Sequence, residues 1–168
     1  MYIRIKTKKN NKEKITKYAY LVENKRRWKK PKQKVKKYLG KVYEYPNTQQ
    51  SSIDISTLSY QDSIKQILLS HLLEINFKLN ENLIQNEDLS VSLIDLKVKN
   101  YKNKNAVIKL NDGFISNYSL KQALNFNLPN ATDKECAKAL ATILISSGFK
   151  ITDDTFISLF KKVYKFEI

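Results

Sequence analysis

Cysteine is nearly absent from this 168-residue chain, and glycine and proline are scarce, with one Cys, three Gly and three Pro. A single thiol, Cys136, excludes an intramolecular disulfide framework and a cysteine-rich zinc site. So few glycines also argue against a glycine-rich phosphate loop. No apolar run approaches the roughly 20 residues of a membrane span, and the basic N-terminus lacks the apolar stretch of a secretion signal. We therefore expect a cytoplasmic protein that does not enter a membrane.

Acidic residues are rare in the first quarter of the chain. The net charge is +15, and residues 1–45 carry 17 Lys and Arg against three acids, a net charge of +14. Residues 46–168 are therefore almost neutral. A charge that serves solubility is spread over a surface, so this concentration indicates a polyanionic partner. We predict nucleic acid, with an acidic protein as the alternative; a membrane surface would be better served by an amphipathic helix.

Residues 1–45 show the period-two pattern of β-strands. Apolar residues alternate with basic ones over residues 2–9, and residues 17–23 and 33–44 are rich in β-formers. The segment 24–31 between them is predicted to be a basic loop. The pattern predicts a small antiparallel three-stranded sheet with one apolar and one cationic face.

The remainder divides into a linker and a mainly helical domain. Residues 46–59 contain few charged and few large side chains, a composition that is typical of a linker. Residues 60–168 are predicted to form a domain that begins with a helix at 60–77. Within it, residues 89–99 and 106–110 are predicted to pair as one β-hairpin, and a short helix is expected to begin near Ser119.

The C-terminal third has the clearest helix signals. Thr132 and Glu135 form a capping box, Gly148 is a stop signal, and Thr152 precedes a second helix. We predict an αα-hairpin whose apolar faces pack inward or meet a partner protein or a second copy of the chain. A helix-turn-helix reader is disfavoured because two aspartates would lie where base edges are met. The fold class predicted for the whole chain is α+β.

Basic and aromatic side chains of the N-terminal module are the candidate contacts to nucleic acid. Lys and Arg neutralise phosphates, and an exposed tryptophan can stack on a base. Trp28 could equally close the open end of the sheet, and Tyr18, Tyr20, Tyr38 and Tyr43 are interpreted as cross-strand partners rather than base platforms. The predicted binding residues are Arg4, Lys6, Lys25, Arg26, Arg27, Trp28, Lys29, Lys30, Lys32, Lys34, Lys36 and Lys37. Composition does not separate DNA from RNA.

The string at residues 18–42 resembles the opening segment of insertion-sequence transposases of the DDE class. Tyr38-Leu39-Gly40, together with Leu21 and Glu23, carries the resemblance. A similar opening occurs in uncharacterised small archaeal proteins. The resemblance implies a nucleic-acid-binding module. It does not imply transposition, because too little chain follows for the catalytic ribonuclease-H-like core.

Catalytic signals are weak, so we expect neither an enzyme nor a bound cofactor or metal. Asp153 and Asp154 are the adjacent acids, but they begin a helix, where negative charge is electrostatically favoured. The lone histidine, His71, lies on an apolar helix stripe, and Cys136 has no basic neighbour to activate it. A small metal-dependent nuclease remains a less favoured alternative.

Overall fold

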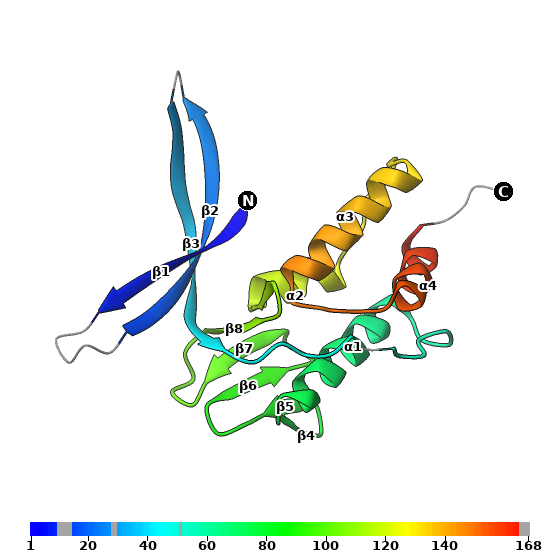
Figure 1. The fold of residues 1–168 in the computed structure, drawn as a ribbon, viewed down its shortest axis with the longest axis horizontal. Helices are drawn as coiled ribbons and strands as arrows, with labels where there is room; N and C mark the ends of the chain where they lie inside the picture. Colours follow the sequence, from blue (N-terminus) through cyan, green and yellow to red (C-terminus); the bar gives the residue numbers. More distant parts are fainter. Residues whose placement is uncertain (10–14, 28–29, 51, 165–168) are drawn as a thin grey trace.

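The computed structural model describes residues 1–9, 15–27, 30–50 and 52–164. Both sheets and helices are present, which confirms the α+β class (Figure 1). The elements are β1 (Tyr2–Lys9), β2 (Ile15–Arg27), β3 (Lys30–Glu44), α1 (Tyr60–Glu74), β4 (Lys78–Asn80), β5 (Leu83–Gln85), β6 (Leu89–Ser92), β7 (Lys97–Asn100), β8 (Ala106–Leu110), β9 (Gly113–Ile115), α2 (Asn117–Leu124), α3 (Asp133–Ser146) and α4 (Asp153–Val163). None of the helices in the described ranges has the length and apolar character needed to cross a bilayer.

The first sheet has the strand order β1-β2-β3-β8-β9. The pairs β1–β2 and β2–β3 are antiparallel, but β3 then pairs in parallel with β8, from Lys41–Ala106 to Glu44–Lys109. The prediction of a three-stranded antiparallel sheet is therefore wrong, because the sheet has five strands and mixed pairing. Two strands so far apart in the chain leave no local trace of their pairing in the sequence.

Gly40 is the residue that allows β3 to approach β8. Its φ is +140°, and a Cβ there would collide with the backbone of Asn105 and Ala106. Glycine has no Cβ and adopts such a φ without steric cost. The tight β3–β8 junction thus depends on a glycine inside a strand, where this residue often marks a close backbone approach.

Two apolar clusters lie on the two faces of this sheet. The smaller one buries Ala19, Leu21, Leu39, Val42 and Val107, with Ile3, Ile5, Phe114 and Tyr118 packed against it. The larger one joins β8 and β9 to the second sheet and to all four helices. Alternation along β8 decides which residue enters which cluster, since neighbouring side chains of a strand point to opposite faces.

The second sheet has the order β4-β5-β6-β7 and antiparallel pairing throughout. It corrects the predicted hairpin of residues 89–99 with residues 106–110. The segment 89–99 folds on itself as β6 and β7, whereas β8 belongs to the first sheet. The three-residue strands β4, β5 and β9 were not predicted, because three residues are too few to show a period.

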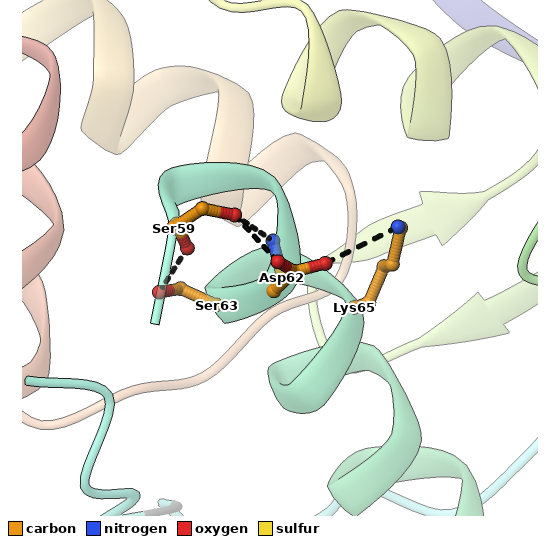
Figure 2. Close-up of polar contacts among 4 residues, drawn as sticks. All are labelled: Ser59, Asp62, Ser63 and Lys65. Carbon is orange, nitrogen blue, oxygen red and sulfur yellow. Dashed lines mark hydrogen bonds and ion pairs between the residues drawn. The ribbon is translucent and has the colours of Figure 1, made fainter. Parts of the chain in front are cut away.

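Helices α1, α3 and α4 begin where the sequence predicted them, and α2 begins at Asn117, two residues before the predicted start near Ser119. The backbone N–H of Asp62 donates to Ser59 Oγ at the start of α1, Ser63 Oγ donates to the Ser59 carbonyl, and Lys65 pairs with Asp62 (Figure 2). Helix α1 ends at Glu74, three residues before the predicted end. The Thr132–Glu135 capping box starts α3, and Thr152 caps α4, so both predicted C-terminal helices are present.

A buried polar network holds the predicted linker against the rest of the chain. Thr48 is buried, its N–H donates to Asn111 Oδ1 at 2.9 Å, and its hydroxyl lies 3.1 Å from Nδ1 of His71. The backbone N–H of Lys150 donates to Nε2 of the same imidazole, and Asn111 Nδ2 donates to the Gly148 carbonyl. Nε2 is therefore an acceptor, which places the proton of the neutral ring on Nδ1. The division at residues 45 and 60 stays a prediction, but this contact fixes the segment locally.

Candidate nucleic-acid interface

The distal half of the β2–β3 hairpin projects away from the rest of the protein (Figure 1). The partner strand β1 reaches only as far as Val22, so beyond that point β2 and β3 have only each other. We call this two-stranded segment, Glu23–Arg27 with Lys30–Lys34, the arm. At about 3.4 Å per residue its five rungs make a ribbon about 17 Å long.

The arm carries most of the predicted basic residues. Its register pairs Lys25 with Lys32, Arg26 with Pro31, and Arg27 with Lys30. The side chains of these residues lie outside the described part of the structure, as do Trp28 and Lys29 altogether. The predicted loop at 24–31 is thus corrected on both sides, because the strands continue through residues 24–27 and 30–31. Pro31 is tolerated because an edge strand of a two-stranded ribbon has unpaired N–H positions.

Two irregularities in the β2–β3 register lie just below the arm. Tyr20 pairs with Tyr38 and Leu21 with Lys37, but Val22 already pairs with Val35, so Lys36 has no rung of its own. Such bulges bend a strand and increase its twist. Lys36 Nζ lies 2.8 Å from a Glu23 carboxylate oxygen, and Lys34 is opposite Glu23.

Tyrosines and cations share one face of the first sheet below the arm. The Tyr38 ring lies 5.4 Å from Tyr20 and 6.3 Å from Tyr18, and Lys6 Nζ lies 5.2 Å from the centroid of the Tyr20 ring. The exposed Arg4 stands opposite Tyr20 in the register. We call these residues the tyrosine face. Tyr20 and Tyr38 are cross-strand partners, as predicted, whereas Tyr18 is opposite Lys41.

Tyr38 is the most accessible of these three rings, with 47% of its surface exposed. Partial burial, followed by the neighbouring hydroxyls of Tyr18 and Tyr20, raises the pKa of Tyr38 above its usual value. The phenol is therefore neutral near pH 7 and offers both an apolar ring and a hydrogen-bond donor. Aromatic rings with nearby cations can stack on bases and attract phosphates.

The base of the arm is tied to β1 by polar side chains. Tyr2 Oη donates to Asn24 Oδ1, Arg4 donates to Gln33 Oε1, and Gln33 Nε2 donates to Tyr2 Oη. These contacts occupy Arg4, so this predicted binding residue also has a structural partner. The set of binding residues predicted from the sequence does not include Lys41, whose Nζ lies 4.9 Å from the centroid of the Tyr43 ring. Lys41 and Tyr43 are two residues apart on one strand, so the sequence already indicated that they share a face.

The opposite face of the sheet is closed by apolar packing and by a charge cluster. Glu44 accepts from Lys17 at 2.7 Å and pairs with Lys109 at 3.3 Å, which joins β2, β3 and β8. These two lysines, Lys17 first, lower the pKa of the Glu44 carboxyl. The cations of this face are therefore partly neutralised within the protein. The tyrosine face and the arm are left as the candidate surface for a polyanion.

The candidate catalytic residues His71, Cys136, Asp153 and Asp154 all lie on helices. His71 is fully buried, and burial lowers its pKa below the usual value, against the opposing influence of Glu74. Burial also raises the pKa of the Cys136 thiol, which opposes formation of the reactive thiolate. Asp153 and Asp154 occupy the first turn of α4, as predicted. No group of three or more His, Cys, Asp or Glu side chains suited to a metal ion occurs among the described residues.

Comparison with known protein families yields one match over the segment that builds this interface. Residues 3–72 match the family model described as the IS1634 family transposase, N-terminal domain. The resemblance to insertion-sequence transposases is confirmed for that segment. It contains β2, β3 and nearly all of β1 and α1, whereas β8 and β9, which complete the sheet, lie outside it. Comparisons with curated proteins and with solved structures give no match.

Proposed function

We propose that this protein binds nucleic acid through the arm and the tyrosine face, without catalysing a reaction on it. The observation that carries the proposal is the register of the arm, which places basic residues on both strands of a projecting ribbon. Like charges at paired positions destabilise an isolated antiparallel ladder. The negative charges of a polyanion relieve this repulsion. Each phosphate that a lysine or arginine neutralises also releases condensed counterions, which adds to the affinity.

The shape of the arm fits the proposal as well as its charge does. The major groove of B-form DNA is about 12 Å wide and admits a two-stranded β-ribbon. An arm about 17 Å long can therefore enter a groove with both strands. The match to a transposase N-terminal domain supports a nucleic-acid role for the same residues. A DNA duplex is the polymer that this geometry favours over folded RNA, whose deep major groove is too narrow for side chains to read.

The binding role is proposed as non-enzymatic because the groups with catalytic chemistry serve the fold. His71 uses both ring nitrogens in the buried network with Thr48 and Lys150. A test is direct: incubation with plasmid DNA and structured RNA, with magnesium or manganese, should leave both polymers intact. Cleavage that disappears in an Asp153→Asn, Asp154→Asn variant would favour the nuclease alternative.

The first test of binding is its dependence on salt. For duplex DNA, log affinity should fall linearly with log salt concentration, with a slope of about −0.9 for each phosphate contact. A shallow slope, or no binding at ~100 mM salt, contradicts the proposal and favours the acidic-protein alternative. Single-stranded DNA and structured RNA, measured under the same conditions, identify the preferred polymer.

The second test locates the binding surface. Alanine at Lys25, Arg26, Arg27 and Lys30 removes four charges from the arm, and we expect affinity to fall roughly a hundredfold to a thousandfold, about 3–4 kcal/mol. The matched control removes four exposed charges from helices α3 and α4 and from the loop that joins them, at Lys134, Lys138, Lys150 and Lys161. Equal losses in the two variants would show that net charge, and not the arm, determines binding.

A further inference from the structure

A cationic pocket lies where β3 leaves the arm and meets helix α2. Its volume is about 250 Å³. Its lining includes three lysines, Lys37, Lys97 and Lys121, and two amide side chains, Asn105 and Asn117. The lysines come from three different elements, β3, β7 and α2, which only the tertiary fold brings together.

The charge of the pocket is only partly compensated. Lys97 Nζ lies 3.6 Å from an Asp95 carboxylate oxygen. Within the described ranges no carboxylate forms an ion pair with Lys37 or Lys121. Both of these lysines are exposed, so their positive charges are available to a ligand.

The amide side chains of the pocket are held in a defined arrangement. Asn117 Oδ1 accepts from the Val98 N–H at 2.8 Å, and Asn117 Nδ2 donates to Asn105 Oδ1 at 3.4 Å. The Asn105 oxygen is thereby engaged, and its amide nitrogen remains the group to donate to a ligand. Gln122 supplies a second amide at the rim. Lysine ammonium groups and amide donors together are the usual partners of a phosphate oxygen.

We propose that this pocket binds a backbone phosphate of the nucleic acid that the arm holds. The inference rests on the proposed function and extends it beyond the segment that matches transposases, because Lys97 and Lys121 lie outside residues 3–72. Tyr38 connects the two regions, since it belongs to both the tyrosine face and the pocket wall. A volume below the roughly 300 Å³ of typical small-molecule sites suits one phosphate group rather than a larger ligand.

The position of the pocket predicts the footprint of the complex. From Lys30 to Lys37 the strand β3 runs about 23 Å at about 3.3 Å per residue. This distance equals the length of about seven base pairs of duplex, since phosphates of one strand are spaced about 3.4 Å along the axis. The shortest duplex that binds with full affinity should therefore exceed about seven base pairs.

The test uses the full chain and the double variant Lys97→Gln, Lys121→Gln. Affinity for duplex DNA should fall about tenfold, and the slope of log affinity against log salt should become shallower by about 1, the loss of one phosphate contact. The control, Lys134→Gln with Lys138→Gln on helix α3, should change neither quantity. An unchanged slope in the double variant overturns the inference, whereas weak binding of the unmodified protein would instead contradict the proposed function.

A second variant and a second probe separate the remaining outcomes. Gln122→Glu places a negative charge at the pocket rim on an exposed position, and it should also weaken DNA binding about tenfold if the pocket holds a phosphate. Inorganic phosphate, titrated into the unmodified protein and followed by amide resonances of residues 97, 117 and 121, reports on the pocket alone. Phosphate binding combined with normal DNA binding by both variants would assign the pocket to free phosphate and overturn the proposal.

Discussion

The arm and the helical part of this protein, residues 60–164, differ in what holds them together. The arm side chains that the structure describes, those of Glu23, Asn24, Gln33 and Lys34, belong to neither apolar cluster. Their contacts include polar bonds at the base of the arm and the Glu23–Lys36 ion pair. The helical part surrounds fully buried residues such as Leu68, Leu140 and Leu159, and it carries a net charge near zero. Residues 60–164 are thus stabilised by a buried apolar core, whereas the arm presents like charges that lower its stability. The difference predicts that binding and folding can be altered separately.

Removal of the arm is the strongest test of this separation. Residues 23–34 can be replaced by Asn-Gly, a two-residue turn that joins the paired residues Val22 and Val35. DNA affinity should fall more than a hundredfold. The free energy of unfolding should change by less than about 1 kcal/mol, or ~3 °C in Tm, because no cluster residue is removed. A large loss of stability would show that the arm supports the fold.

A core substitution should have the opposite effect. Leu140 is fully buried on α3, and Leu140→Ala should lower the free energy of unfolding by about 3 kcal/mol through lost burial and a residual cavity. Urea denaturation measures this loss. DNA affinity at a temperature well below Tm should stay within about twofold, and a greater loss would mean that the helical core positions the binding surface.

The His71 network predicts a pH dependence that the arm does not share. Burial lowers the folded-state pKa of this imidazole, so the unfolded chain binds the proton more readily. Stability is therefore greatest above the unfolded value of about 6.5 and falls as the pH drops below it, by at most about 1.4 kcal/mol per pH unit. Denaturation at pH 7.5, 6.5 and 5.5 should show this loss. The variant His71→Gln should lack the pH dependence in that window, whereas Glu44, Asp62 and Glu135 have lowered pKa values and act at more acidic pH.

Loss of a helix cap should give the smallest effect. Thr132 accepts a hydrogen bond from the backbone N–H of Glu135 and begins α3. Thr132→Ala should lower the free energy of unfolding by about 1 kcal/mol and leave DNA binding unchanged. The neighbouring substitution Lys134→Ala removes a charge without a cap and serves as the control in the same denaturation experiment.

Local signals in the sequence predicted the elements whose causes are local. The capping box at Thr132, the alternation over residues 2–9 and the apolar stripe around His71 all appear in the structure as helix start, strand and buried face. The basic segment at 24–31 was misread as a loop, because charge reports on solvation and not on backbone pairing. Its strand character comes from the partner strand across the hairpin.

The candidate site was predictable only in part, for the same physical reason. The density of Lys and Arg pointed to the segment that forms the arm, whereas Tyr38 was interpreted as a cross-strand partner and not as a binding residue. Lys97 and Lys121 are ordinary surface lysines in the sequence. They become neighbours of Lys37 only after β3 pairs with β8 and α2 packs against the first sheet. A site assembled from three separated elements has no spacing pattern to detect.

The parallel pairing of β3 with β8 also sets the order in which the molecule can fold. The β2–β3 hairpin closes a short loop. The pairing of Lys41 with Ala106 closes a much longer loop, and its entropic cost must be met before the contact forms. During synthesis, a chain that has emerged only as far as Leu72 has its hairpin but not Val107, so Val42 and Leu39 lack part of their cover. We therefore expect residues 3–72, the segment that matches the transposase N-terminal domain, not to complete their sheet alone, because β8 lies outside that segment.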